Sequence, residues 1–308
     1  MEVIDLNYFP NSNEEIELIK FIAKYQYLNV ADARYFFSSK KYYRNRISNL
    51  VSKRFLRKVK LNLVLDELGI EYAKLFNFEY NIRNRNKKYL NRLLYISHLA
   101  AFYHSCNTIN FVPSFAIKDK EMFTITARRF IGTLEVNGID YLTYSISENH
   151  DKKYQNSVIY DIQKEKKYQN IIILVNDISR LSTSDFSFGM NQVLVVEDND
   201  ANREKLKYLH SIDKTRLLED IYKKPMSISE YNFCDYTDHK NKYVSIFYFL
   251  DTEKITRIKN FLRENKNKNA DIVCSSKLAN ELKNELPNAH YIVTNLEEYI
   301  DKERIIYD

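Results

Sequence analysis

The spacing of the apolar residues changes near Asn110, and this change limits the folds that are open to the chain. Before it, most apolar residues recur at helical spacing, whereas after it short β-prone runs alternate with helical stretches. Strands that alternate with helices are typical of an α/β domain with a largely parallel sheet. The turn pair Asn137-Gly138 predicts a hairpin, and therefore an antiparallel portion at the N-terminal side of that sheet.

The elements expected after Asn110 are short. The strand-like runs are 111–117, 122–125, 131–136, 141–146, 171–175, 193–196, 244–250, 271–274 and 291–293. The helical stretches are 152–167, 201–209, 252–264, 277–286 and 296–301. We predict that these elements form one mixed-sheet α/β domain over 109–308.

The first third of the chain shows a different succession of patterns. The predicted elements are helices over 13–28, 29–37 and 40–54, β-like runs over 56–60 and 61–65, and a helix over 66–76. Asn13 can cap the first helix, and Ser38 and Ser39 can cap the third. This order is that of a winged helix-turn-helix, which we place over 1–80. The alternative is a generic helical bundle with one basic side.

The basic residues are unevenly distributed. Residues 1–92 hold 18 Lys and Arg against 10 Asp and Glu, and since the whole chain has 47 and 41, the remainder holds 29 against 31. From Arg34 to Lys60 there are ten basic residues and no acidic one. A solvated helix face normally mixes the two signs, so this stretch predicts an anionic partner rather than a merely basic surface.

This basic stretch predicts how double-stranded DNA would be bound. Lys40, Lys41, Arg44 and Asn45 stand near the start of the third helix and are expected to face the major groove. Tyr42 is expected to contact a thymine methyl group or a phosphate. The complete predicted DNA-binding set is Ser39, Lys40, Lys41, Tyr42, Tyr43, Arg44, Asn45, Arg46, Lys53, Arg54, Arg57, Lys58, Lys60, Arg83, Arg85, Lys87 and Lys88. Of these, Arg54, Arg57, Lys58 and Lys60 at the wing are expected to contact phosphates or to reach the minor groove. The last four form a second basic cluster that is expected to extend the footprint.

A helix predicted over 81–108 joins the two domains. Its later part, 93–103, is apolar on most sides, which predicts either a bridge between domains or a homodimer interface. His98 and His104 lie near it six residues apart, whereas a helical metal pair stands four apart, so we interpret them as core histidines.

Several enzyme classes are disfavoured by what their chemistry requires. The four glycines form no phosphate-binding loop, and the cysteines and histidines form no zinc-ligand pairs. No two histidines stand two apart, as rolling-circle initiators and relaxases require, and none is followed by Arg at the third position, as in tyrosine recombinases. We therefore predict no cofactor, no metal ion and no catalytic residue.

One catalytic alternative stays open, a metal-dependent nuclease. The order of hairpin, helix and strand over 131–175 fits such a core, but the run 141–147 carries hydroxyl groups where a carboxylate and a lysine are needed. The stretch 161–167 has a similar spacing of Asp, Glu and Lys, which we interpret as solvated charge at a helix end. Glu135 and Asp140 flank the Asn-Gly turn and are interpreted as the outside of a hairpin.

The cysteines and the apolar runs indicate the cellular compartment in which the protein is expected to act. Three widely spaced cysteines (Cys106, Cys234 and Cys274) are typical of reduced thiols in the cytoplasm. No apolar run approaches the roughly 20 residues of a membrane span. We expect a cytoplasmic protein that contacts no membrane.

Three segments together resemble a known family. They are 16–37, the end of the basic helix at Ile47-Ser-Asn-Leu-Val-Ser-Lys-Arg-Phe-Leu-Arg57, and the Ser97-His-Leu-Ala-Ala-Phe-Tyr103 segment. Over roughly 14–175 the chain resembles the replication-relaxation proteins of plasmids and conjugative elements. The resemblance implies a winged helix-turn-helix, a helix with a His-Leu-Ala-like segment, and a degenerate restriction-endonuclease-like core. The chain departs from the Pro-Asp and Glu-x-Asp carboxylates that this family often has on its core strands.

The residues and the resemblance lead to one expectation. We expect a sequence-specific double-stranded DNA-binding protein of a plasmid or phage that binds AT-rich repeats as a homodimer. It would act in replication initiation, conjugation or transcription control. Two alternatives remain: a metal-dependent nickase or nuclease built on the α/β domain, and a scaffold that recruits a replication, conjugation or partition partner to DNA.

Overall fold

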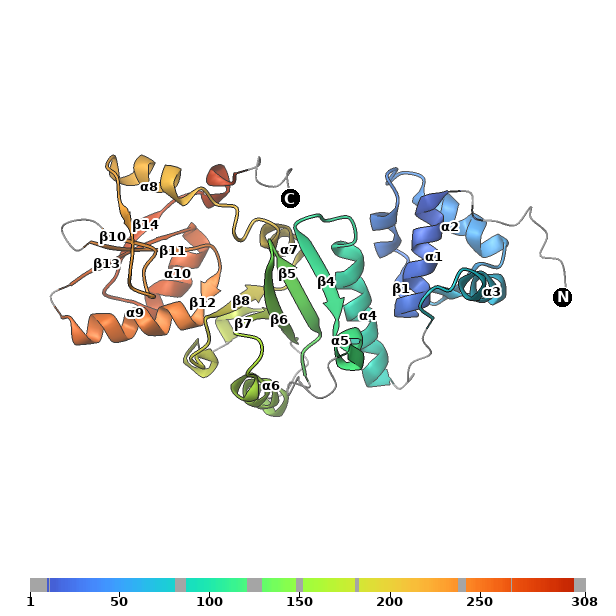
Figure 1. Ribbon diagram of the computed structural model, residues 1–308, viewed down its shortest axis with the longest axis horizontal. Coiled ribbons are helices and arrows are strands. Elements are labelled where there is room, and N and C mark those ends of the chain that lie inside the picture. Colours follow the sequence, from blue (N-terminus) through green and yellow to red (C-terminus); the bar gives the residue numbers. More distant parts are fainter. Residues whose placement is uncertain are drawn as a thin grey trace. The chain divides into compact units, whose positions relative to one another are not determined.

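A computed structural model describes residues 10, 12–80, 87–120, 129–147, 152–180, 183–237, 242–266 and 268–301. The chain has mixed α and β structure and divides into two compact units, Met1–Cys106 and Asn107–Asp308 (Figure 1). None of the helices within these ranges is long and apolar enough to cross a membrane.

The first unit combines helices with one small antiparallel sheet. Its elements are α1 (Asn13–Tyr25), β1 (Leu28–Asn29), the 3₁₀ helix η2 (Asp32–Phe36), α2 (Tyr43–Ser52), β2 (Leu56–Val59), β3 (Asn62–Leu65), α3 (Glu67–Leu75) and α4 (Lys87–Phe102). The sheet has the order β1-β3-β2. The sequence missed β1, because a strand of two residues has no periodicity of its own and exists only through its pairing with β3.

Local interactions explain where α1 begins and where the hairpin β2–β3 turns. Ser12, rather than the expected Asn13, caps α1, and its side chain accepts a hydrogen bond from the Glu15 N–H. The hairpin pairs Val59 with Asn62, which leaves a two-residue turn in which Lys60 has a φ of 58°. Such a turn keeps the twist of the two strands, so the hairpin is short and regular.

Helix α4 packs within the first unit rather than standing apart as a connector. Ser97 Oγ donates to the Tyr27 carbonyl oxygen at 2.5 Å, and His98 Nδ1 lies 2.9 Å from Asp32 Oδ2. The apolar side chains that were expected to form a dimer interface are largely buried in this chain, with Leu93 at 1% and Leu99 at 0% exposed. An interface with a second copy therefore gains no support from α4.

The second unit contains two sheets rather than the single one expected. The first has the order β12-β8-β7-β6-β5-β4. Its strands are β4 (Ile109–Pro113), β5 (Gly132–Val136), β6 (Ile139–Ile146), β7 (Asn170–Val175), β8 (Gln192–Glu197) and β12 (Leu250–Asp251). β6, β7 and β8 are parallel to one another, and β4 and β5 are antiparallel. The predicted hairpin turn is confirmed, with positive φ at Asn137 and Gly138.

The second sheet has the order β14-β13-β11-β10-β9. Its strands are β9 (Ser227–Ile228), β10 (Tyr236–Thr237), β11 (Tyr243–Phe247), β13 (Ala270–Cys274) and β14 (His290–Val293). β11, β13 and β14 are parallel, and β9 and β10 add an antiparallel edge. The run 244–250 was expected to be one strand, but the chain leaves the second sheet after Phe247 and joins the first at Leu250.

The other helical elements connect these strands along the chain, except η5, which follows the last strand. They are α5 (Ser114–Lys120), α6 (Lys152–Lys164), η3 (Ile178–Arg180), η4 (Thr183–Phe186), α7 (Asp200–Leu206), α8 (Lys214–Tyr222), α9 (Thr252–Glu264), α10 (Ser276–Glu285) and η5 (Leu296–Tyr299). The expected strand over 111–117 ends at Pro113, where α5 begins, and α8 was not expected. The run 122–125 lies outside the described residues.

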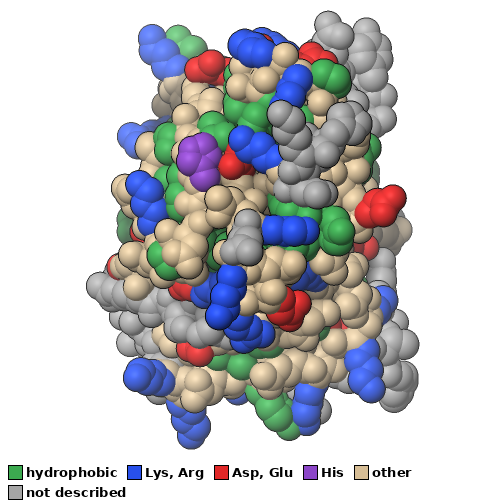
Figure 2. Space-filling model, turned by 90° about the vertical axis from the view of Figure 1, so that its left-hand side faces the viewer, with side chains coloured by type: hydrophobic (Ala, Val, Ile, Leu, Met, Phe, Trp, Pro, Cys, Tyr) green, Lys and Arg blue, Asp and Glu red, His purple; other side chains and the backbone are tan. Residues whose placement is uncertain are grey.

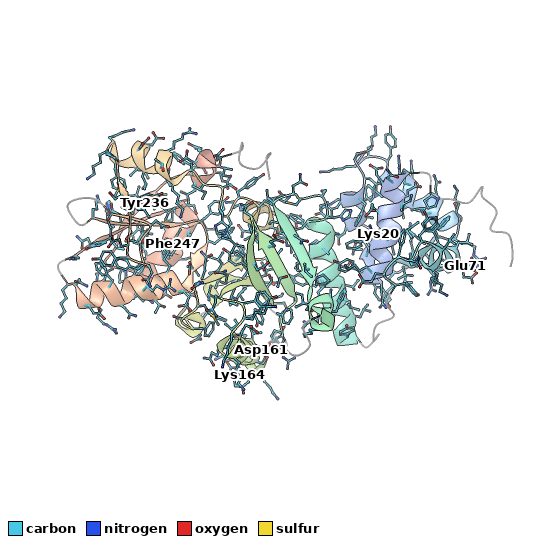
Figure 3. The ribbon with its side chains drawn as sticks, viewed as in Figure 1. Lys20, Glu71, Asp161, Lys164, Tyr236 and Phe247 are labelled. Carbon is cyan, nitrogen blue, oxygen red and sulfur yellow. The ribbon has the colours of Figure 1, made fainter. Side chains whose placement is uncertain are left out.

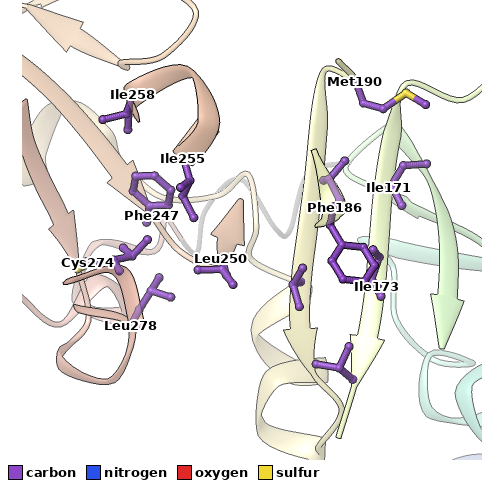
Figure 4. Packing of buried hydrophobic residues seen from close by; sticks show 14 of the residues in the cluster. Ile171, Ile173, Phe186, Met190, Phe247, Leu250, Ile255, Ile258, Cys274 and Leu278 are labelled. Atoms are coloured by element: carbon purple, nitrogen blue, oxygen red, sulfur yellow. The ribbon is translucent and has the colours of Figure 1, made fainter. Parts of the chain in front are cut away.

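One buried apolar cluster contains residues of both sheets (Figure 4). Ile171 and Ile173 come from β7, and Phe247 and Cys274 come from the second sheet. Leu250 on β12 is 2% exposed and belongs to the same cluster. The second unit is therefore held together by a shared core as well as by strand pairing.

Candidate nucleic-acid interface

The basic helix begins later than the sequence suggested. α2 starts at Tyr43, and neither Ser38 nor Ser39 caps it, because its N-cap residue is Tyr42 without a side-chain hydrogen bond. The backbone N–H of Ser38 instead donates to Glu14 Oε1 at 2.8 Å. Ser39, Lys40, Lys41 and Tyr42 therefore lie exposed in the turn that leads into the helix.

Six of the ten basic side chains in the acid-free stretch are exposed and make no ion pair within the described part of the chain. They are Lys40, Lys41, Arg44, Arg57, Lys58 and Lys60. We call these six side chains the cationic set. They come from the turn before α2, from the first turn of α2 and from the hairpin β2–β3, and DNA contacts were expected from these parts of the chain.

Two other predicted contacts are held by carboxylates from outside the stretch. Arg46 Nη1 lies 3.1 Å from Glu14 Oε2 and donates to Ser12 Oγ at 2.8 Å, so it ties α2 to the beginning of α1. Arg54 forms an ion pair with Glu67 on α3. Both arginines have a role inside the first unit, and the half-buried Lys53 is also less available than the cationic set.

Glu14 joins this arrangement electrostatically. The backbone N–H and the side chain of Ser38 both donate to its carboxylate, and Arg46 adds a positive charge. These contacts hold the pKa of Glu14 below its ordinary value. The carboxylate therefore stays ionised and fixes the turn before α2, together with Arg46, against α1.

Aromatic rings lie among the cationic side chains at the start of α2. Arg44 Nε donates to the Tyr43 hydroxyl at 3.3 Å. The Lys41 ammonium lies 5.8 Å from the centre of the Tyr42 ring, whose side chain is 55% exposed. Asn45 is exposed beside them. Arg and Asn side chains can each make two hydrogen bonds to a purine edge in the major groove.

The hairpin adds apolar groups that were not among the predicted contacts. Val59 is 40% exposed and Leu61 is 74% exposed, whereas Leu56 and Leu63 in the same hairpin are fully buried. A strand with one buried face alternates inward and outward residues, but Arg57, Lys58 and Val59 are all exposed. The sequence signal that could have revealed this is the apolar Leu61 in a tight turn, where polar residues are usual.

The remaining predicted contacts lie at or beyond a gap in the description. Arg83 and Arg85 fall outside the described residues. Lys87 and Lys88 form the first residues of α4, and their side chains are also outside the description.

The histidines near α4 have partners inside the first unit. His98 is held by Asp32, as the fold showed. The His104 ring lies 4.3 Å from the Phe36 ring centre, and its partial burial lowers the pKa of its imidazole. His98 is half-buried and His104 is only partly covered, so both histidines have partners inside the first unit, as expected of satisfied histidines, but neither is fully buried.

Glu165 in the second unit differs from its interpretation as solvated charge. It is 3% exposed, and its Oε1 accepts the N–H groups of Lys166, Lys167 and Tyr168. This carboxylate ends α6 at Lys164, three residues before the expected end at 167, because it satisfies the backbone groups that follow the helix.

The other carboxylates considered for nuclease chemistry lie on two different parts of the second unit, helix α6 and the hairpin β5–β6. Asp161 lies with Lys164 on α6 (Figure 3) and accepts the Arg129 N–H. Glu135 and Asp140 face each other across the β5–β6 hairpin, and Asp140 is exposed. No group of three or more potential metal ligands occurs within the residues that the structure describes.

Charged groups elsewhere in the second unit serve its own packing. Burial of Asp235 is outweighed by Lys254 and Lys214, which together lower the pKa of its carboxyl group to about 2. Figure 2 shows one end of this unit, where Lys and Arg side chains are scattered among acidic and apolar ones.

Comparison with protein-family models, with characterised proteins and with solved structures found no match to this chain.

Proposed function

We propose that the first unit is a winged helix-turn-helix that binds double-stranded DNA. In this proposal η2 and α2 form the turn unit, α2 is the recognition helix, and β2–β3 is the wing. The succession of elements and the β1-β3-β2 sheet support this interpretation. The observation that carries it is the cationic set, six exposed basic side chains that make no ion pair within the described residues and that stand in the turn before α2, on α2 and on the hairpin β2–β3.

The two parts of the proposed interface contact different groups of the DNA. Arg44 and Asn45 in the first turn of α2, together with Lys41 just before it, face the base edges of the major groove in the specific complex. Arg57, Lys58 and Lys60 on the wing contact phosphates beside it. Arg46 holds α2 in place through Glu14, so it supports the interface without reading the DNA. The biological setting that we propose is a plasmid or phage, in replication initiation, conjugation or transcription control.

The salt dependence of DNA binding tests this proposal. On a random-sequence duplex, where no base edge is matched to the protein, all six side chains of the cationic set lie against phosphates. If each neutralises one phosphate, log affinity falls against log salt with a slope of about −5. Fluorescence anisotropy of the full chain with a labelled random-sequence duplex pool measures that slope. An affinity that barely changes with salt would contradict the proposal.

Two variants locate the interface. Arg44→Ala is expected to weaken binding to the random-sequence pool and to reduce the magnitude of the slope by about 1, because one of the six phosphate-neutralising charges is lost. The matched control is Arg263→Ala, which removes another exposed helical arginine, from α9 in the second unit. The control should bind like the unaltered protein, and equal losses in both variants would place the interface elsewhere.

A further inference from the structure

The wing ends in an apolar tip that its charge does not explain. Leu61 is 74% exposed and Val59 is 40% exposed, and Lys58 and Lys60 alternate with them along the chain. A solvated turn gains nothing from a leucine, because apolar surface is removed from water only when something covers it. The sequence from Arg34 to Lys60, which leads up to and includes most of the tip, contains no acidic residue.

The tip is also fixed in position before any partner arrives. The Leu61 carbonyl oxygen accepts the Val30 N–H at 2.9 Å, and Asn62 pairs with Asn29 on β1. Asn29 Oδ1 in turn accepts the Ala31 N–H at 2.9 Å. Leu61 is therefore presented on a two-residue turn whose backbone is tied to the segment before η2, so binding needs little reordering of the hairpin.

These observations fit the minor groove of the same DNA. The minor groove is about 6 Å wide, which admits a narrow turn, and its negative potential attracts lysine side chains. Leucine is one of the apolar residues that proteins insert between base pairs in this groove, where it unstacks one step and bends the duplex. A protein pocket for Leu61 would need carboxylates to accept Lys58 and Lys60 as well.

We propose that Leu61 is a minor-groove wedge that bends the DNA bound by the first unit. The inference rests on the proposed duplex binding and adds to it a defined insertion and a change in DNA shape. Val59 covers the sugar edge beside the wedge, and Lys58 and Lys60 hold the adjoining phosphates.

Ring closure of short DNA tests the wedge. Duplexes enriched from a random pool by gel shift with the unaltered protein are placed in the centre of fragments of about 150 base pairs, close to the persistence length of DNA, so that closure by ligase depends on bending. The full-length protein should accelerate closure. Leu61→Ala should lower that acceleration at least about fivefold at saturating protein, while affinity falls only about three- to tenfold.

Two further variants complete the experiment. Leu61→Phe keeps an apolar wedge and should retain the acceleration of closure. Leu75→Ala removes another exposed leucine, 55% exposed at the end of α3, and should behave like the unaltered protein. Equal closure with and without Leu61, or no acceleration by the unaltered protein when it is bound, would overturn the wedge and leave duplex binding intact. An absence of salt-dependent duplex binding would instead overturn the proposed function itself.

Discussion

Two tyrosines of strand β6 show how the surroundings of a single side chain decide its effect on stability. The Tyr141 hydroxyl donates to Gln192 Oε1 at 2.6 Å and lies 2.8 Å from His210 Nε2. The Tyr144 hydroxyl is buried and has no hydrogen-bond partner within the described residues. Burial raises the pKa of both phenols, so both stay protonated at neutral pH.

Removing each hydroxyl should change stability in opposite directions. Tyr144→Phe is expected to raise the free energy of unfolding by about 1 kcal/mol, because it removes a buried polar group that is not hydrogen-bonded. Tyr141→Phe is expected to lower it by about 1 kcal/mol, because Gln192 loses its donor. Urea unfolding of the two variants at neutral pH measures the difference, and a loss of stability in Tyr144→Phe would mean that its hydroxyl has a partner.

At the scale of elements, helix α3 packs against the hairpin β2–β3 with its backbone very close to the backbone of Phe55. Gly69 is buried in the first turns of α3, and a Cβ atom added there would lie 2.1 Å from the Phe55 carbonyl oxygen. Phe55 stands directly before β2, and its carbonyl also accepts the Asp66 N–H at 3.0 Å. The helix can therefore pack onto the hairpin only with glycine at this position.

Replacement of this glycine should reverse the usual rule for helices. Gly→Ala in a helix interior ordinarily stabilises by about 1 kcal/mol. Gly69→Ala is expected to destabilise the first unit by at least about 2 kcal/mol, because backbone atoms must move apart. Thermal unfolding followed by circular dichroism measures this loss. The control is Lys74→Ala, an exposed position on the same helix, which should change stability by less than about 0.5 kcal/mol.

At the scale of the whole molecule, the chain divides into two units, and all residues of the proposed DNA interface belong to one of them. The cationic set, the sheet β1-β3-β2 and the contacts of α4 with Tyr27 and Asp32 all belong to Met1–Cys106. The two sheets and their shared core belong to Asn107–Asp308. DNA binding is therefore expected to reside in the first unit alone.

A fragment of residues 1–106 tests this separation. It is expected to fold by itself and to bind the duplex pool with the salt slope of the full chain, about −5, because the cationic set is complete within it. Circular dichroism and fluorescence anisotropy check folding and binding. A folded fragment with a much smaller slope would show that residues after 106 contribute phosphate contacts.

The sequence by itself determined the local elements, because turns, caps and periodicity act between near neighbours. The helices and the β2–β3 hairpin of the first unit, though not the two-residue strand β1, were visible in it. The Asn137-Gly138 hairpin and the acid-free stretch were visible as well. Only the tertiary structure decided which strands share a sheet and which charges meet. Arg46 finds Glu14 on another helix, and the chain passes from one sheet to the other between Phe247 and Leu250. Such contacts join residues that are distant in sequence or belong to different sheets, so no local pattern encodes them.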